Sequence, residues 1–280
     1  MPERLLLFKT DAVVEGVHFT PETPPEKIGH KALGRCLSDI AAMAGTPTAA
    51  LVTIGLPTNF STEFVEAIYA GLNALARRHQ VAVAGGETTT NPGGIFISVA
   101  LLGWVPRGKG VLRSGAEVGD AIFVTGELGG SLAGKHLDFE PRLAEARWLA
   151  ANFGVHAMID LSDGLAGDLP HLLAASGGLG ADIRAASVPV SRAARELARA
   201  GDLAKPALLA ALTDGEDFEL LFAVAPSDAV RVLDGWKAEF PETRLSCIGK
   251  TRAEPGVILR DETGAKPMPR GGYEHFHGPR

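Results

Sequence analysis

The stretch LLLFKTDAVVEGVHF, residues 5–19, combines an apolar run with a carboxylate, Asp11, and then a glycine-containing loop. Residues 5–17 are expected to be extended, because Leu, Phe and Val dominate them. A carboxylate at the end of a buried strand needs a cation or hydrogen-bond donors to offset its lost hydration. Asp11 is therefore either a turn-capping residue or a ligand, and this stretch alone leaves both interpretations open.

Two further acidic residues of the N-terminal half stand in unusual surroundings. Asp39 lies in a helix expected over residues 27–45, close to its apolar stripe, although Asp is a poor helix former. Glu87 follows a glycine pair that ends a short strand expected at 81–84, and such a turn lets backbone N–H groups close on an anion. A helix-surface Asp and a simple tight turn are the ordinary alternatives.

The C-terminal half adds the run Asp160-Leu161-Ser162-Asp163-Gly164 between a strand and a helix. A helix N-terminus can receive a phosphate, and two carboxylates beside it would repel each other without a cation. Four acids also crowd into residues 214–219, which a charged loop would explain equally well. Together the clusters predict oxygen ligands for a hard cation such as Mg²⁺, which usually serves phosphate chemistry.

Composition and missing motifs exclude several classes of protein. The 280 residues carry a net charge of −6, which argues against broad nucleic-acid binding, and no apolar run is long enough for a membrane span. No P-loop motif, zinc spacing or Gly-x-Ser-x-Gly elbow is present. The N-terminus lacks the features of a secretory signal, and the two cysteines lie far apart, so a reduced, cytoplasmic protein is expected.

Alternating strands and helices predict an α/β or α+β fold in two domains, residues 1–108 and 109–280, joined by a polar, glycine-rich linker at 106–110. The first domain is expected to contain further strands at 49–56 and 95–104 and a helix at 61–79. The second is expected to contain strands at 121–125, 157–159, 219–225 and 245–249, and helices at 143–152, 164–175 and 228–240.

Motifs spread from residue 10 to residue 276 resemble those of the thiamine-monophosphate kinase family, and they occur in the family's order. They are TDAVVEGVHF at 10–19, LSDIAAMAG at 37–45, GGETT at 85–89, RSGA at 113–116 with GD at 119–120, IDLSDGL at 159–165, GEDFELLF at 215–222 and GYEHF at 272–276.

The resemblance implies the two-domain fold of the aminoimidazole-ribonucleotide-synthetase-like superfamily. Its N-terminal α/β domain pairs with that of a second subunit in a shared barrel, and its C-terminal α/β domain closes over the nucleotide. The implied reaction is direct transfer of the γ-phosphoryl group of ATP to thiamine monophosphate, giving thiamine diphosphate and ADP. No phosphoenzyme forms in this family, so no nucleophilic catalytic residue is expected.

Carried over by position, the resemblance assigns three sets of residues. The Mg²⁺ ligands would be Asp11, Asp39, Glu87, Asp160 and Asp163, with Thr10 assisting. The ATP contacts would come from Gly86, Glu87, Arg113 and Ser162. Thiamine monophosphate would be contacted by His18 and Glu216, and Tyr273 would stack on a substrate ring.

Three features depart from the family pattern. The chain opens at the strand before Thr10, without the family's preceding segment that ends in a Gly-Asp-Asp metal loop. Lys9 stands where Ser or Thr is common, which puts a cation beside the expected metal ligands. Glu87 replaces an Asp and displaces its carboxylate by about 1.5 Å, the length of a C–C bond. A superfamily enzyme with another small substrate, and a nucleotide-binding homologue with impaired catalysis, are the alternative functions.

Overall fold

The computed structural model describes residues 3–201 and 205–272, and the chain forms two compact units. Unit 1 comprises Met1–Gly110 together with the segment Leu137–Leu143, and unit 2 comprises Val111–His136 and Ala144–Arg280. The sequence placed a boundary at residue 108 and gave no sign that the later segment joins unit 1. Among the described residues, no helix is both long and apolar enough to cross a membrane.

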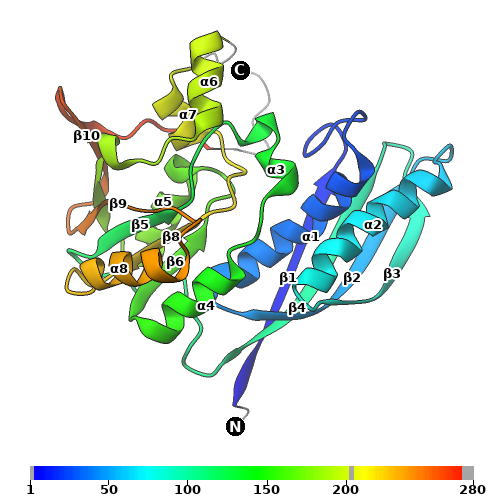
Figure 1. The fold of residues 1–280 in the computed structure, drawn as a ribbon, viewed down its shortest axis with the longest axis horizontal. Coiled ribbons are helices and arrows are strands. Elements are labelled where there is room, and N and C mark those ends of the chain that lie inside the picture. Colours follow the sequence, from blue (N-terminus) through cyan, green and yellow to red (C-terminus); the bar gives the residue numbers. More distant parts are fainter. Residues whose placement is uncertain (1–2, 202–204, 273–280) are drawn as a thin grey trace. The chain divides into compact units, whose positions relative to one another are not determined.

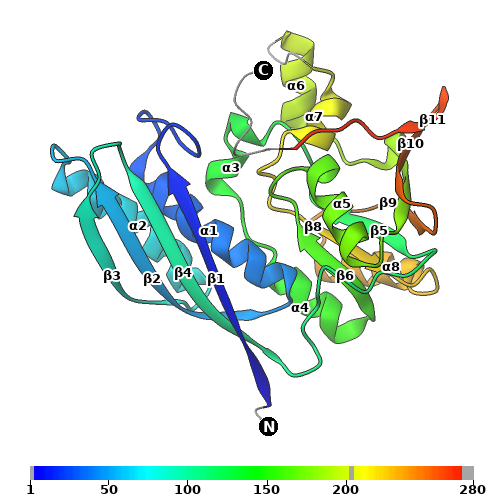
Figure 2. The same cartoon turned by 180° about the vertical axis from the view of Figure 1, so that it is seen from behind.

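Unit 1 is a four-stranded sheet with two helices on one face (Figures 1 and 2). The strand order is β1 (Arg4–Val14), β4 (Phe96–Pro106), β2 (Thr46–Leu56) and β3 (Ala82–Thr90). Helix α2 (Thr62–Arg78) buries one apolar stripe, as its spacing predicts, whereas α1 (Pro25–Ala42) is buried at twelve of its 18 residues. Among the described strands of this sheet, β2 and β3 pair in parallel and the other neighbours pair antiparallel.

The glycine pair of unit 1 does not form the expected turn. Instead of ending at residue 84, β3 runs on to Thr90, and Gly86 stands opposite Val52 of β2. A Cβ at Gly86 would lie 1.8 Å from the Val52 carbonyl oxygen, so the close approach of the two strands requires glycine. The turn predicted for residues 85–87 is therefore wrong, and Glu87 stands within a strand.

The segment Leu137–Leu143 is held on unit 1 by side-chain contacts. Phe139 is buried, and its carbonyl oxygen lies 2.8 Å from Nε2 of His30. Asp138 pairs with Lys27 at 2.7 Å. A Cβ at Gly34 would come within 2.8 Å of the Phe139 ring, so a glycine on α1 leaves the space that this ring fills.

Unit 2 is built on a seven-stranded, mostly antiparallel sheet. The strand order is β11 (Gly264–Pro267), β10 (Gly256–Asp261), β7 (Gly180–Arg184), β9 (Leu245–Arg252), β5 (Ala121–Thr125), β8 (Leu220–Val224) and β6 (Val155–Asp160). Its helices are α4 (Leu143–Asn152), α5 (Leu165–Ala175), α6 (Arg192–Ala200), α7 (Ala207–Thr213) and α8 (Ala229–Glu239), with 3₁₀ turns at Ser131–Ala133 and Ala185–Ser187. The short helix α3 (Lys135–Asp138) begins in unit 2 and ends in the segment that belongs to unit 1.

The central strands β5 and β8 are buried along their whole length, because helices cover both faces of the sheet (Figures 1 and 2). On one face α5 contributes Leu165 and Leu169 to a core shared with Ile122 of β5. Strand alternation puts the stacked rings of Phe123 and Phe222, 5.3 Å apart, on the opposite face. This double coverage explains why both strands read as continuous apolar runs.

Most of the expected elements are confirmed, namely the helices α1, α2, α4, α5 and α8 and the strands β1, β2, β4, β5, β6, β8 and β9. Not predicted from the sequence were β7, α3, α6, α7 and the hairpin of β10 and β11. The β10–β11 hairpin is largely exposed, so it carries little of the apolar alternation by which a strand is recognised.

Candidate functional site

Unit 1 contains a compact group of two cations and two carboxylates, which we call the Lys9 cluster: Lys9, Asp11, Arg35 and Asp39. Strand alternation turns Lys9 and Asp11 toward α1, on the same face of β1 as the buried Leu7 and Val13. Arg35 and Asp39 are four residues apart on α1, so they share one face of that helix.

Each carboxylate of the Lys9 cluster has a cationic partner. Lys9 Nζ lies 2.9 Å from Asp39 Oδ2 and 3.9 Å from Asp11 Oδ2. Arg35 Nη2 lies 3.3 Å from Asp11 Oδ1, and its Nη1 donates to the Ala12 carbonyl at 3.0 Å. The Asp11 side chain also accepts from the Ala12 N–H at 2.9 Å. The cluster is therefore charge-balanced by residues of the chain itself.

Burial and neighbouring charge act in opposite directions on these groups. Burial raises the pKa of Asp39, and the Lys9 ammonium opposes that rise. Burial alone would lower the pKa of Lys9, but Asp39 and Asp11 together raise it above its ordinary value. Lys9 accordingly remains an ammonium group at neutral pH.

The other residues expected to bind metal in unit 1 lie away from the Lys9 cluster. Thr10 points to the opposite face of β1, where its Oγ1 lies 3.5 Å from Ser98 Oγ. Glu87 is exposed on β3, which forms the opposite edge of the sheet from β1. Three strand spacings separate these edges, about 14 Å. One ion cannot bind Asp11 and Glu87 of the same chain.

His18 lies in the loop that follows β1 and is held by the backbone. Its Nδ1 accepts from the Val14 N–H at 3.1 Å, which places the proton of the neutral ring on Nε2. The buried Lys31 of α1 donates from Nζ to the His18 carbonyl at 2.6 Å. This loop therefore has a fixed backbone from which a donor can be presented.

In unit 2, the turn between β6 and α5 carries Asp160, Ser162 and Asp163. It is hydrogen-bonded along its backbone to the loop before β8, with Glu216 N–H donating to Ser162 O at 2.7 Å and Phe218 N–H to Leu161 O at 2.8 Å. Glu216 has a φ of 54°, a left-handed conformation that is uncommon for Glu. Its Oε2 lies 3.1 Å from His136 Nδ1.

The β6–α5 turn concentrates negative charge. Asp168 is buried and accepts from the Asp163 N–H through Oδ2 at 2.9 Å. Burial, followed by the charges of Asp160 and Asp163, raises the pKa of Asp168 to about 8. Such mutual repulsion among carboxylates is relieved when a cation binds beside them. The donors of this turn therefore fit Mg²⁺, which is usually held by one or two carboxylates together with phosphate oxygens.

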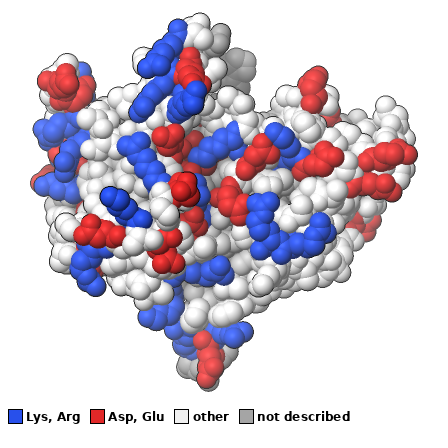
Figure 3. Space-filling view, in the orientation of Figure 1, with Lys and Arg blue, Asp and Glu red and all other residues white. Residues whose placement is uncertain are grey.

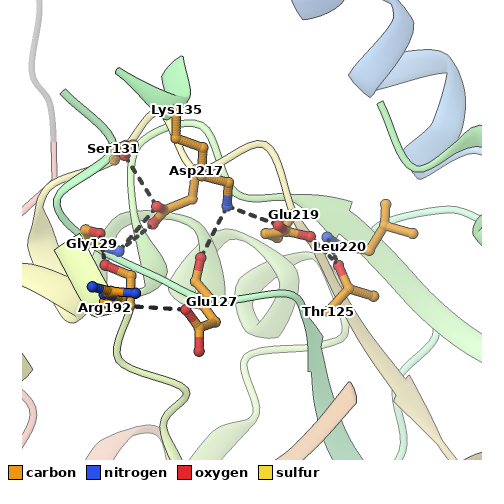
Figure 4. Close-up of polar contacts among 11 residues, drawn as sticks. Thr125, Glu127, Gly129, Ser131, Lys135, Arg192, Asp217, Glu219 and Leu220 are labelled. Carbon is orange, nitrogen blue, oxygen red and sulfur yellow. Dashed lines mark hydrogen bonds and ion pairs between the residues drawn. The ribbon is translucent and has the colours of Figure 1, made fainter. Parts of the chain in front are cut away.

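Three of the four acids in residues 214–219 accept hydrogen bonds from a glycine-rich segment that follows β5, and Figure 4 shows two of these acids, Asp217 and Glu219. Asp217 accepts from the Gly129 N–H at 3.0 Å and from Ser131 Oγ at 3.1 Å. Glu219 accepts from Lys135 Nζ and from Thr125 Oγ1, both at 2.8 Å. The third, Asp214, accepts from the Gly130 N–H at 2.8 Å. The prediction that these three acids belong to the clusters of Mg²⁺ ligands is therefore wrong, because their side chains stabilise the loop.

This loop and Lys135 were not among the residues predicted from the sequence to be functional. The sequence does contain a sign of such a loop, namely the glycine-rich run TGELGGS at 125–131 directly after a buried strand. Burial raises the pKa of Asp217 to about 7, although the Lys135 ammonium and the Gly129 N–H oppose that rise. Lys135 Nζ also donates to the Glu127 carbonyl at 3.0 Å, which ties the two ends of the loop together.

The remaining candidate residues are either exposed to solvent or lie outside the described residues. Arg113 is exposed, and it has no ion-pair partner within the described part of the chain. Gly86 is exposed on β3. Tyr273, expected to stack on a substrate ring, falls in the part of the chain that the structure does not describe.

No set of three or more His, Cys, Asp or Glu side chains within residues 3–201 and 205–272 is arranged to hold a metal ion. Both cysteines are free: Cys36 is buried and Cys247 half-buried. Acidic and basic side chains are interspersed on the face drawn in Figure 3. That face shows none of the single-sign regions expected of a nucleic-acid-binding surface.

Family models and curated relatives match almost the whole chain. The model described as AIR synthase related protein, N-terminal domain, matches residues 1–105, and the corresponding C-terminal domain matches 117–262. A thiamine-monophosphate kinase of Rhodopirellula baltica is 44% identical over 255 residues, which span 91% of this chain and 78% of that protein. One from Escherichia coli is 33% identical over 304 residues, covering 100% and 89% of the two chains.

Solved structures show the same likeness. The structure described as "AaThiL complexed with AMPPCP and TMP" is 29% identical, with a TM-score of 0.84 over 98% of this chain and 88% of that one. A thiamine-monophosphate kinase from Stenotrophomonas maltophilia is 33% identical, with a TM-score of 0.81 over 92% and 85% of the two chains. The hydrogenase maturation protein HypE of E. coli, at 23% identity, shares the fold.

Proposed function

Because the chain belongs to the thiamine-monophosphate kinase family of AIR-synthase-related proteins, we propose that it transfers the γ-phosphoryl group of ATP to thiamine monophosphate. The products are thiamine diphosphate and ADP. The observation that carries the proposal is the β6–α5 turn, where burial, followed by the charges of Asp160 and Asp163, raises the pKa of Asp168. A site with this much negative charge suits a divalent cation accompanied by a nucleotide.

In this proposal Asp160 and Asp163 would hold Mg²⁺, and Glu87 would contribute a carboxylate on unit 1. The metal supplies charge neutralisation for the phosphate oxygens. Arg113 is exposed and can pair its planar fork with phosphate, while Gly86 and Ser162 contact ATP. Catalysis then consists of positioning and electrostatic stabilisation, without a protein nucleophile.

Two residues of the described chain, His18 and Glu216, are proposed to contact thiamine monophosphate. His18 lies in the loop after β1, where its Nδ1 accepts from the Val14 N–H, and the backbone of Glu216 is held by its hydrogen bond to Ser162. A left-handed Glu held by hydrogen bonds is the kind of strained residue that collects at binding sites. Tyr273 stacks on a substrate ring in the same proposal.

We further propose that the enzyme is a homodimer that pairs through the open face of the unit 1 sheet. Large apolar side chains are exposed on the face away from the helices: Leu6 is 72% exposed, Phe8 73% and Leu51 52%. Phe8 stands directly opposite Leu102 of β4, so these residues form one patch across neighbouring strands. An apolar patch of this kind marks an interaction surface, and a second copy of this chain is its proposed occupant.

A thiamine diphosphate formation assay with ATP, Mg²⁺ and thiamine monophosphate tests the proposed function. We expect turnover by the folded protein and a fall of at least ~100-fold in Asp163→Asn, because electrostatic stabilisation of the transferred group is lost. Asp234→Asn on the exposed face of α8 is the matched control and should keep its activity. Absence of thiamine diphosphate from folded protein would overturn the proposal, and turnover of another phosphate acceptor would support the superfamily alternative.

A further inference from the structure

The Lys9 cluster contains its own cation at the point where the family resemblance expects a metal. We infer that the ammonium group of Lys9 takes the place of a magnesium ion at Asp39, so that the Asp11–Asp39 pair binds no divalent cation. The identity of the site as a kinase centre rests on the proposed function, whereas the occupancy of Asp39 by Lys9 rests on the geometry of unit 1.

The ammonium nitrogen of Lys9 lies in the space that a metal ion bound to Asp39 and Asp11 would need. Mg²⁺ requires ligand oxygens at about 2.0–2.1 Å in a nearly octahedral arrangement. Lys9 Nζ already stands 2.9 Å from Asp39 Oδ2 and 3.9 Å from the nearer oxygen of Asp11. A cation bound between these carboxylates would occupy the volume of the ammonium group and would be repelled by its charge.

Charge balance leads to the same conclusion. Arg35 covers the other oxygen of Asp11 at 3.3 Å, so two positive charges face two negative ones. The Lys9 side chain is one-third exposed, and that of Asp39 is 35% exposed, so the pair lies at the border of the solvent. Partial burial strengthens the ion pair relative to a fully hydrated surface pair.

The backbone fixes Lys9 in this position. Alternation along β1 turns its side chain toward α1, because Leu7 and Val13 on the same face are buried beneath the helices. Asp39 is anchored on α1 between buried neighbours, Ser38 and Ile40. The pairing thus follows from the register of a strand against a helix and does not depend on a flexible loop.

Direct metal binding in the absence of nucleotide tests the inference on the full-length chain. Mn²⁺ serves as the probe, and the unbound ion is counted by electron paramagnetic resonance. We expect Lys9→Met to bind one more Mn²⁺ than the wild type, because it vacates the space beside Asp39 and removes the competing charge. The double variant Lys9→Met with Asp39→Asn should lose that additional ion.

Three matched variants separate this effect from general changes. Lys9→Arg keeps the charge and should leave the number of bound ions unchanged. Lys27→Met removes a comparable ion pair of unit 1, 2.7 Å from Asp138, and should also leave it unchanged. Asp39→Asn in the wild-type background should lose no ion. A second substitution, Lys9→Thr, repeats the gain with the side chain common in the family.

Two outcomes would overturn the inference: no additional ion in folded Lys9→Met and Lys9→Thr, or loss of an ion from Asp39→Asn alone. Neither outcome depends on turnover. If the thiamine diphosphate assay fails while the number of bound ions rises as expected, the proposed function is wrong and the role of Lys9 stands. If thiamine diphosphate is formed but the number of bound Mn²⁺ ions does not rise in Lys9→Met, the role inferred for Lys9 is wrong and the proposed function stands.

Discussion

At the scale of single residues, unit 2 keeps two carboxyl groups buried with pKa values far above those of exposed aspartates. Asp217 is 1% exposed, and its oxygens accept from Gly129 and Ser131. The charged groups around it, Lys135 and Glu219, act in opposite directions on its pKa, and burial outweighs both. The carboxyl group of Asp217 therefore favours its protonated form below neutral pH.

This burial predicts a pH dependence of stability. The pKa of Asp217 rises from 3.8 to about 7 on folding, so between these values the folded chain holds a proton that the unfolded chain has released. The free energy of unfolding should fall as the pH rises through this window, by at most about 1.4 kcal/mol per pH unit for this group.

Urea unfolding from pH 4.5 to pH 7.5 checks the prediction, with Asp217→Asn as the comparison. The variant has no titrating carboxyl at this position, and its decline in stability with pH should be shallower than that of the wild type. Asp168, whose pKa is raised to about 8, continues to contribute in both proteins. Equal slopes in the two proteins would contradict the assignment.

At the scale of elements, α1 and α2 approach so closely that their backbones touch at two glycines. A Cβ at Gly29 would lie 1.9 Å from the Ile68 carbonyl oxygen, and one at Gly71 would lie 1.9 Å from that of Glu26. Both nearest atoms are backbone carbonyl oxygens, which cannot move aside as the end of a flexible side chain could. Small residues at these positions set the distance between the helices and thereby the position of α1 over β1.

Gly29→Ala should lower the free energy of unfolding by about 1–3 kcal/mol, because overpacking against backbone outweighs the gain in helix propensity of up to about 1 kcal/mol. Denaturant unfolding measures the loss. Gly93→Ala, where the nearest atom would be Asn91 Oδ1 at 3.8 Å, is the control and should be close to neutral. A stable Gly29→Ala protein would show that the helices can separate without cost.

At the scale of the whole molecule, the open face of the unit 1 sheet is the surface that the proposed dimer uses. Phe8→Glu should weaken association by at least ~100-fold, because a carboxylate without a partner is costly to bury in an apolar interface. The folded monomer should persist, since Phe8 is 73% exposed in the single chain.

Light scattering after size-exclusion chromatography gives the mass that decides this prediction. The wild type should have about twice the mass of one chain, and the variant should have the mass of one chain at micromolar concentration. Val230→Glu, at a position 68% exposed on α8 of unit 2, is the matched control and should stay dimeric. A wild type that is monomeric at all concentrations would contradict the proposed assembly.

The sequence determined the elements and the chemical types at the site. Periodic apolar residues gave α1, α2 and α5, because which face of a helix or strand is buried is a local property of the chain. The motif around Asp160 and Asp163 was readable for the same reason, since a strand, a hydroxyl and a helix start follow one another within five residues. Family membership also follows from such motifs in order.

The tertiary structure decided which acids remain available to a ligand, because that depends on partners distant in the chain. Asp217 and Glu219 bind groups of the loop after β5, more than 80 residues earlier. Strand order places Glu87 and Asp11 on opposite edges of one sheet. Strand register against α1 brings Lys9 to Asp39. Local composition cannot reveal these pairings, since they arise only when the sheet and helices assemble.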